Sequence, residues 1–298
     1  MSNNEHRSGR VALIGWTNVG KSTLLNQLVG VKIAAVADVS QTTRHQILGV
    51  TPVDDRAQIA YVDTPGWHRP QHRMNRRMME RTRESLRDVD AIIWVIDGSK
   101  SVGPGDKEVL RALKEIDIPC IAAINKIDKV SKKASLLPQI EALAKERDFH
   151  AIIPISAASG DGCDALTEAV IELLPVGPPM FDDDFLTDQS QRQIVSELVR
   201  EQLVRQTREE LPHSTAVVID LWEEEGDLVR IEASVVVERD SQKKIVIGRQ
   251  GGLLKSVGTA ARLEIEKLLE RKVYLRLWAR AHRDWRNDRA ALRELGLH

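Results

Sequence analysis

One stretch near the N-terminus limits the fold of this chain more than any other. Residues 15–22 read GWTNVGKS, which matches the G-x-x-x-x-G-K-S pattern of a phosphate-binding loop. An apolar run, Val11–Ile14, precedes the loop, and an amphipathic run containing Leu24, Leu25 and Leu28 follows it. The motif therefore has the strand–loop–helix context that it needs, and a Gly-rich turn without function is the weaker interpretation.

The loop predicts a specific phosphate chemistry. Its glycines let backbone N–H groups turn toward a β-phosphate, and the helix N-terminus adds positive potential. Lys21 can reach the β- and γ-phosphates, and the Ser22 hydroxyl can coordinate Mg²⁺. The predicted nucleotide contacts of this loop are Gly15, Trp16, Thr17, Asn18, Val19, Gly20, Lys21, Ser22 and Thr23.

Composition excludes several other classes of protein. The chain has 298 residues, enough for two domains with cores, and a formal net charge of -1. Its two cysteines, Cys120 and Cys163, lie far apart without zinc-ligand spacing, so we expect buried, reduced thiols. Residues 1–10 are polar, and no run approaches 18 apolar residues, so neither a signal sequence nor a membrane span is expected.

Strand and helix patterns alternate after the loop. Apolar runs predict strands, and helical spacing of apolar residues predicts the helices between them. Because such alternation produces a mostly parallel sheet covered on both faces, the binding site should lie at the carboxyl ends of the strands. The predicted strands are 10–15, 46–51, 57–62, 91–96, 119–124 and 151–155, and the predicted helices are 21–29, 75–89, 107–116, 133–147 and 163–174.

A second loop motif follows the strand 57–62. The residues Asp63, Thr64, Pro65 and Gly66 read D-T-P-G, followed by Trp67. Alone this is a common turn, but behind a phosphate loop Asp63 can hold Mg²⁺ through water and the Gly66 N–H can sense a γ-phosphate. Thr43, or less favourably Thr42, can place a hydroxyl on the same ion.

A third motif predicts the base that is bound. Asn125, Lys126, Ile127 and Asp128 read N-K-x-D directly after a strand. The carboxylate of Asp128 can accept hydrogen bonds from guanine N1 and N2 together, whereas adenine offers no such pair. After another strand, Ser156 and Ala157 can offer a backbone N–H to guanine O6. A solvated turn is the alternative for N-K-x-D alone, and the order of the motifs argues against it.

The first strand also excludes another nucleotide-binding class. No G-x-G-x-x-G follows it, so the chain is not a dinucleotide-binding oxidoreductase.

The second half of the chain has a different pattern. Residues 174–179 read LPVGPP and break the preceding helix, and an acidic connector runs to Asp188. The order that follows is helix, strand, strand, helix, loop, helix, strand. The predicted loop is Gly248-Arg249-Gln250-Gly251, with Lys255 one turn into the next helix. Taken with its flanking elements, this G-x-x-G resembles the loop of a KH domain in its type II order.

Positive charge is concentrated in this region. Residues 239–293 contain 15 Lys or Arg and 6 Asp or Glu, a net charge of +9 in a nearly neutral chain. An RNA-binding face needs such charge, although a solvated surface could also carry it. Near the end, Trp285 either stacks on a base or packs on the domain.

Together the motifs GWTNVGKS, QTTRH, DTPG, NKID and SA resemble those of the Era group of translation-factor-class GTPases, and the KH pattern extends the resemblance over nearly the whole chain. The resemblance implies an α/β P-loop GTPase domain over residues 1–176, a linker over 177–190 and an α+β type II KH domain over 191–298. It also implies a monomeric GTP/GDP switch that binds the 3′ end of 16S ribosomal RNA and assists assembly of the 30S subunit. The implied location is cytoplasmic, with peripheral contact to the inner membrane.

The resemblance also bears on hydrolysis. Trp67 stands where many small GTPases have a water-positioning Gln, and the Era group is similar in having an apolar residue there. Asn18 resembles an Asn that binds K⁺ in related GTPases, although a turn residue bonding its own backbone is an equal interpretation. The expected catalytic residues are therefore Lys21, Thr43, Gly66 and Asn18, and the expected metal ligands are Ser22, Thr43 and Asp63.

Two other functions compete with this interpretation. One is a nucleotide-gated scaffold with vestigial catalysis, which Trp67 would permit; it would bind GTP without multiple turnover. The other is an ATP-driven RNA-remodelling enzyme, which Asn125, Asp128 and the absence of helicase motifs argue against.

Overall fold

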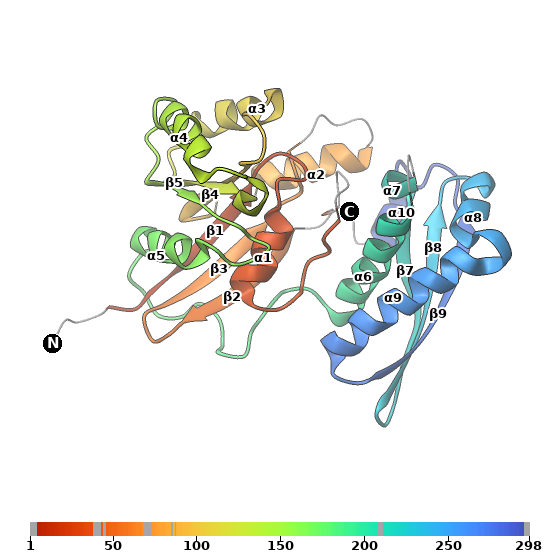
Figure 1. The fold of residues 1–298 in the computed structure, drawn as a ribbon. Helices are drawn as coiled ribbons and strands as arrows, with labels where there is room; N and C mark the ends of the chain where they lie inside the picture. Colours follow the sequence, from red (N-terminus) through yellow and green to blue (C-terminus); the bar gives the residue numbers. More distant parts are fainter. Residues whose placement is uncertain are drawn as a thin grey trace. The chain divides into compact units, whose positions relative to one another are not determined.

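The computed structural model describes residues 5–37, 43, 46–67, 73–84, 86, 88–207 and 211–294. The chain divides into two compact units. One comprises Met1–Ala34, Thr43–Arg69 and Met78–Asp188, and the other comprises Ala35–Thr42, Pro70–Arg77 and Gln189–His298. Each unit has its own sheet and its own hydrophobic core (Figure 1).

Strands and helices alternate along the first unit. Its strands are β1 (Arg7–Ile14), β2 (Ile47–Val53), β3 (Ala57–Asp63), β4 (Ala91–Asp97), β5 (Cys120–Asn125) and β6 (Ala151–Pro154). Its α-helices are α1 (Lys21–Val29), α3 (Pro104–Leu113), α4 (Leu137–Ala144) and α5 (Cys163–Leu173), with α2 (Arg73–Glu84) spanning the boundary of the units, and η1 (Ile127–Lys129) and η2 (Lys133–Leu136) are short 3₁₀ turns.

These strands form one six-stranded sheet in the order β2-β3-β1-β4-β5-β6. All neighbours are parallel except β2, which pairs antiparallel with β3. The predicted mostly parallel sheet is confirmed. The carboxyl ends of β1, β3, β4, β5 and β6 consequently meet at one edge, where the sequence motifs lie.

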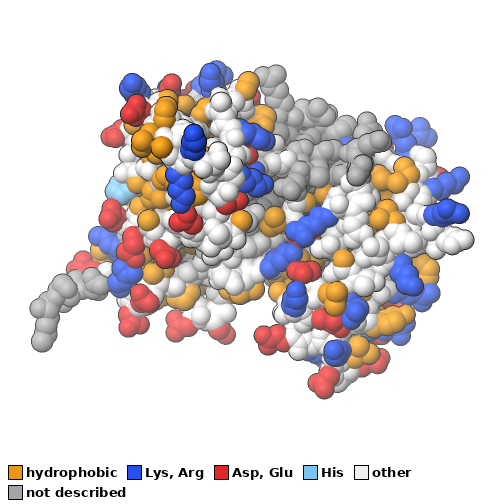
Figure 2. All heavy atoms as spheres, in the orientation of Figure 1, with side chains coloured by type: hydrophobic (Ala, Val, Ile, Leu, Met, Phe, Trp, Pro, Cys, Tyr) orange, Lys and Arg blue, Asp and Glu red, His pale blue; other side chains and the backbone are white. Residues whose placement is uncertain are grey.

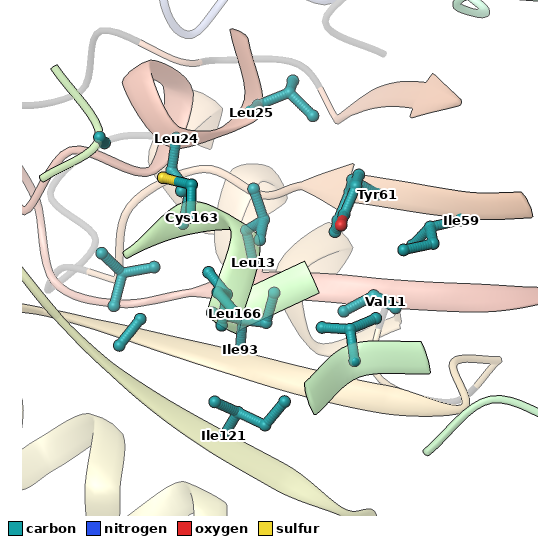
Figure 3. Packing of buried hydrophobic residues seen from close by; sticks show 14 of the residues in the cluster. Val11, Leu13, Leu24, Leu25, Ile59, Tyr61, Ile93, Ile121, Cys163 and Leu166 are labelled. Carbon is teal, nitrogen blue, oxygen red and sulfur yellow. The ribbon is translucent and has the colours of Figure 1, made fainter. Parts of the chain in front are cut away.

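Both faces of the sheet are covered. On one face Val11 and Leu13 of β1 share a buried cluster with Leu24 of α1 and Leu166 of α5 (Figure 3). On the other face the alternate residues of the same strands join residues of α3, α4 and the end of the α2 region in a second cluster. Because alternate side chains of a strand point to opposite faces, the strands between two helical layers are apolar throughout.

Three helices in the first half of the chain differ from the sequence prediction. Helix α2 spans Arg73–Glu84 rather than 75–89. Helix α3 begins at Pro104, earlier than predicted, because Asp106 Oδ2 accepts a hydrogen bond from Gly103 N at 2.9 Å and caps the first turn. The helix predicted over 133–147 is wrong as a single element. It divides into η2 and α4, with Pro138 at the start of α4, where a missing N–H breaks no helical hydrogen bond.

The second unit packs helices on one face of a three-stranded sheet. The sheet order is β7-β8-β9, with β7 and β8 antiparallel and β8 and β9 parallel. Its strands are β7 (Ala216–Glu225), β8 (Leu228–Val237) and β9 (Lys272–Ala281), and its helical elements are α6 (Gln191–Gln206), α7 (Leu211–Ser214), α8 (Asp240–Ile247), η3 (Arg249–Gly251), α9 (Gly252–Leu269) and α10 (Arg289–Glu294).

Local signals explain this order. Helix α6 begins after Ser190, whose side chain accepts from Gln193 N while the Gln193 side chain accepts from Ser190 N. Val199 of α6, Ile231 of β8 and Ile265 of α9 are fully buried in the core. Among the helices that the structure describes, none is long and apolar enough to span a bilayer.

The acidic connector has fixed contacts within the first unit. Gln58 of β3 donates to Phe181 O at 2.9 Å and accepts from the N–H groups of Met180 and Phe181. Further along, Leu186 O accepts from Val50 N, and Asp188 accepts from Leu48 N at 3.0 Å. The connector therefore lies along β2 and β3 rather than hanging free.

Candidate nucleotide site and RNA groove

The phosphate loop has the backbone shape that its sequence predicts. Asn18 and Gly20 have positive φ angles of 63° and 100°, and Gly20 leads directly into α1. A Cβ at Gly20 would lie 2.3 Å from the Asn125 amide nitrogen, and one at Gly15 would lie 2.4 Å from Val95 O. Larger residues at these two positions would force the loop apart, so both glycines are required by close approach.

Lys21 is a buried cation at the floor of the loop. It is 6% exposed, and its Nζ donates to Gly15 O at 3.2 Å and to Trp16 O at 3.1 Å. Burial lowers the pKa of Lys21 to about 8, and the nearby Asp63 opposes this shift. A phosphate beside Nζ would favour the charged form, so the group suits an anionic ligand.

Three oxygen-bearing side chains meet beside Lys21. Ser22 Oγ lies 2.5 Å from Thr43 Oγ1 and donates to Asp63 Oδ2 at 2.8 Å. Asp63 is fully buried, which raises its pKa to about 6 despite Lys21 and the hydroxyls. Its other oxygen, Oδ1, is buried and has no hydrogen-bond partner among the residues that the structure describes. Hydroxyl and carboxylate oxygens are ligands that Mg²⁺ prefers, so this set fits the ion expected from the sequence.

The D-T-P-G motif ends β3 at the same place. Thr64 Oγ1 donates to Leu13 O at 2.9 Å, which ties the motif to β1. A Cβ at Gly66 would lie 3.3 Å from Lys21 Nζ, so this backbone passes close to the lysine. Trp67 N donates to Gly15 O, while its side chain is 7% exposed and packs in the core cluster. The indole therefore faces the core. His68 and Gln41–Thr42 lie outside the described residues.

The N-K-x-D residues join three loops. Asn125 Nδ2 donates to Val19 O at 2.8 Å, and its Oδ1 accepts from Ala157 N at 2.9 Å. Ser156 Oγ donates to Asp128 Oδ1 at 2.7 Å and orients that carboxylate. Ile127 is buried beneath them. The motif residues predicted on separate strands are thus brought together.

Asp97, at the end of β4, belongs to this site and was not predicted. Lys126 Nζ donates to Asp97 Oδ2 at 2.9 Å and to Asn18 O at 2.5 Å. Burial alone would raise the pKa of Asp97, but hydrogen bonds from Ser99 and Lys126 outweigh it and hold the pKa below its usual value. Its sequence signal was only an acidic residue ending an apolar strand.

The G-x-x-G loop joins two helices of the second unit. Gly248 has φ 73° and ψ 177°, Gln250 has φ 53° and Gly251 has φ 76°. Arg249 and Gln250 are exposed at the tip, and Lys255 is exposed on α9. Figure 2 shows Lys and Arg side chains over the face that carries α8 and α9. The loop therefore presents backbone and positive charge to solvent.

A groove of about 360 Å³ continues from this loop. It runs between α9 and β9, and its lining includes the apolar residues Leu254, Leu275 and Leu277 and the basic residues Arg262 and Arg276. Gly258 of α9 has no side chain, which leaves room for the groove beside Leu277. Sequence reasoning found Gly251 and Lys255 but missed these other residues, because only the packing of α9 on β9 brings them together. Trp285 is not in the groove: it is fully buried and donates to Ser214 O at 3.0 Å, so it packs on the domain.

Comparison with known proteins agrees with both halves of this geometry. Residues 10–126 match the family described as 50S ribosome-binding GTPase, and residues 210–286 match the KH domain family. The chain is 45% identical over 298 residues to GTPase Era of Geobacter metallireducens, covering 99% of each chain. The chain belongs to the Era family of GTPases.

Other Era proteins extend the match. Era of Stenotrophomonas maltophilia is 46% identical over 292 residues, which cover 98% of this chain and 97% of that protein. A solved structure of Era in complex with MgGDPNP and nucleotides 1506–1542 of 16S ribosomal RNA superposes with a TM-score of 0.95 at 37% identity, covering 98% and 99% of the two chains. The predicted combination of a P-loop GTPase fold and a KH domain is thereby confirmed.

Proposed function

We propose that this GTPase is a switch that binds the 3′ end region of 16S ribosomal RNA and assists assembly of the 30S subunit. One observation carries the proposal: the same chain holds two sites. Lys21, Ser22 and Asp63 form a site suited to phosphate and metal, and a groove continues from the G-x-x-G loop. The Era protein solved with MgGDPNP and 16S RNA supports it, because the likeness extends over both units.

We assign the nucleotide site as follows. Lys21 neutralises charge on the β- and γ-phosphates, the Gly66 N–H senses the γ-phosphate, and Asp128 reads guanine. Asn125 braces the loops through Val19 and Ala157, as its two hydrogen bonds support. The remaining predicted nucleotide contacts of the two phosphate-side motifs are Gly15, Trp16, Thr17, Val19, Gly20, Thr23, Thr64, Pro65 and Trp67.

Ser22 and Thr43 would hold Mg²⁺ directly, with Asp63 in support. The ion would neutralise phosphate charge during transfer. The buried Oδ1 of Asp63, for which the described part of the chain offers no hydrogen-bond partner, supports this assignment.

K⁺ beside Asn18 is a separate proposal. A monovalent cation there would add positive charge to the developing phosphate charge. The exposed side chain of Asn18 at a left-handed backbone position supports it, and the same backbone conformation also suits an ordinary turn residue.

The proposed RNA contacts are in the second unit. Gly248 and Gly251 let the RNA backbone approach the helix ends, Arg249 and Lys255 pair with phosphates, and Gln250 lies at the tip; such a loop clamps about four nucleotides. We propose domain boundaries of 1–176, 177–190 and 191–298, which the α5 end and the Ser190 cap support.

Equilibrium binding to labelled RNA tests the RNA assignment. The probe is nucleotides 1506–1542 of 16S rRNA, and an RNA of the same length from the 3′ end of 23S rRNA is the specificity control. We expect preference for the 16S probe and a loss of about tenfold on combining Arg249→Ala with Lys255→Ala, since each removes a phosphate contact. Lys267→Ala removes an exposed cation from α9 outside the groove and should change little. Equal binding of both RNAs would contradict the assignment.

We further propose a monomer located in the cytoplasm with loose contact to the inner membrane. Light scattering on the purified protein tests the monomer. Co-sedimentation with vesicles containing anionic lipid tests the membrane contact, and protein remaining in the supernatant at low salt would contradict it.

A further inference from the structure

The solvent face of β9 carries a row of aromatic and basic side chains. Val273, Leu275 and Leu277 of this strand pack toward the helices. The alternate residues therefore lie on the other face of the sheet, because successive side chains of a strand point to opposite sides. These alternate residues are Lys272, Tyr274, Arg276, Trp278 and Arg280.

Two rings stand out on this face. Tyr274 is 50% exposed and Trp278 is 46% exposed. Among the residues that the structure describes, no other Trp, Tyr or Phe side chain is as exposed. They lie four residues apart on one strand, about 13 Å at the usual rise per residue. Two exposed rings on one strand form a surface that suits a ligand with flat apolar faces.

Cations accompany both rings. The Arg276 guanidinium lies 4.2 Å from the centre of the Trp278 ring, and that of Arg230 lies 5.9 Å from the Tyr274 ring. Glu232 lies opposite Arg276 in the sheet, but it forms its ion pair with Arg230, at 3.0 Å. β9 itself contains Lys272, Arg276 and Arg280 and no acidic residue.

The row is continuous with the proposed RNA groove. Arg276 lines the groove between α9 and β9 and also lies over Trp278. β9 is the edge strand of its sheet, so no further strand separates the groove from this face. A chain leaving the groove past Arg276 would reach Trp278 directly.

We propose that the open face of β9 is a second binding surface for single-stranded RNA, on which bases stack on Tyr274 and Trp278 while phosphates pair with Lys272 and Arg276. The inference rests on the proposed RNA-binding function and extends its footprint beyond the G-x-x-G groove. Alternating rings and cations suit a single strand, because every base has a π-face and every nucleotide a phosphate. A protein partner fits less well, since a single RNA strand supplies both a flat base and a negative charge at each nucleotide, which matches the alternation of rings and cations on β9.

The test compares short and long RNA. An oligouridine of about six nucleotides fills little more than the roughly four that a KH loop clamps, whereas one of about fourteen can also reach β9. For the Tyr274→Ala/Trp278→Ala double variant we expect affinity for the long RNA to fall by about tenfold or more, with little change for the short RNA. Phe at both positions should restore most of the long-RNA affinity. Leu137→Ala, which removes an exposed apolar side chain from the first unit, is the matched control.

Salt dependence gives a second measure. In Lys272→Gln, the slope of log affinity against log salt for the long RNA should become shallower by about 0.7 for one lost phosphate contact. The slope for the short RNA should not change.

Photocrosslinking of the unaltered protein is independent of any effect on folding. Long RNA containing 5-iodouridine should crosslink to a peptide that holds Tyr274 or Trp278. Unchanged long-RNA affinity in the double variant, or crosslinks confined to the G-x-x-G loop, would overturn the second surface while leaving the groove intact.

Other outcomes bear on the proposed function itself. If the parent protein bound neither oligouridine nor the 16S probe, the proposed RNA function would be overturned. Loss of binding to 30S subunits but not to RNA would identify β9 as a protein contact instead.

Discussion

At the scale of single residues, Lys21 is the clearest example of a side chain kept for a ligand. Its Nζ is buried against carbonyl oxygens, which cannot neutralise a charge as an anion can. Buried charges are costly unless paired, so a bound phosphate would stabilise Lys21 as a cation. Asp63 is likewise a fully buried charged group, and a bound cation would stabilise its ionised form.

Replacing Lys21 with Ala should therefore remove GTP binding. Loss of charged hydrogen bonds to two phosphates is expected to weaken affinity by about 100-fold or more. Titration with a fluorescent GTP analogue measures it. Lys114→Ala, which removes an exposed partner of Glu146, should bind as the parent does. Unchanged affinity in Lys21→Ala would contradict the phosphate-loop assignment.

Asp128→Asn should change which base is bound. In the proposed site the Asp128 carboxylate accepts hydrogen bonds from guanine N1 and N2, whereas the amide introduced by the substitution could donate to the C2 oxygen that xanthine carries in place of the N2 amino group. Ser156 Oγ already holds this position in place, so the swap should leave the geometry intact. Competition between GTP and xanthosine triphosphate is the measurement, with Asp164→Asn as a control outside the site. An unaltered preference for GTP would mean that Asp128 does not face the base.

The two thiols should be unreactive in the folded protein. Burial raises the pKa of Cys120 to about 12 and is the main cause that raises the pKa of Cys163 to about 11. Because only the thiolate attacks, both stay protonated at pH 8. Reaction with a disulfide reagent should be slow until denaturant is added and then consume two thiols. Fast reaction of either thiol under native conditions would be inconsistent with this burial.

At the scale of elements, the G-x-x-G loop illustrates how backbone shape is specified. Gly248 has φ 73° with ψ 177°, a combination that is open almost only to glycine, and a Cβ there would lie 2.7 Å from Leu253 Cβ. Gly251 has φ 76° with ψ 8°, and its Cβ would meet nothing within 4 Å. Replacing Gly248 with Ala should therefore lower the free energy of unfolding more than replacing Gly251 with Ala.

Gly248→Ala is expected to destabilise the second unit by about 3 kcal/mol and Gly251→Ala by about 1 kcal/mol. Denaturant unfolding of the full chain, followed through a probe in the second unit, measures both. Equal costs for the two variants would show that the loop does not hold the backbone described here.

The elements also show what sequence can reveal. Helix α1 was predicted over its observed range, because the phosphate loop fixes its start and Gly30, at φ 79°, ends it. Strands buried on both faces were equally clear as apolar runs. The division of 133–147 was missed because helical spacing of apolar residues outweighed the signal of Pro138. Asp97 and the groove residues Leu275 and Leu277 could not be predicted, because their role depends on which strands and helices become neighbours in space.

At the scale of the whole molecule, the central claim is that one chain couples a GTPase site to an RNA-binding unit. The connector along β2 and β3 is held by Gln58 and by Asp188, which accepts from Leu48 N. Leu48 lies five residues after Thr43, the proposed Mg²⁺ ligand. The chain that leads to the second unit is thus anchored to the strand that follows this proposed ligand, which gives a covalent route by which the nucleotide site could act on the second unit.

Phosphate release from saturating GTP, with K⁺ or Na⁺ and with or without the 16S RNA spanning nucleotides 1506–1542, tests this claim most directly. We expect multiple turnover, stimulation by the RNA of at least about tenfold, and a faster rate in K⁺, because added positive charge stabilises the transition state. The Arg249→Ala/Lys255→Ala variant should keep its basal rate and lose the stimulation. A rate that is indifferent to both RNA and the cation would leave a GTPase and an RNA-binding domain that merely share a chain, and GTP binding without turnover would indicate a nucleotide-gated scaffold.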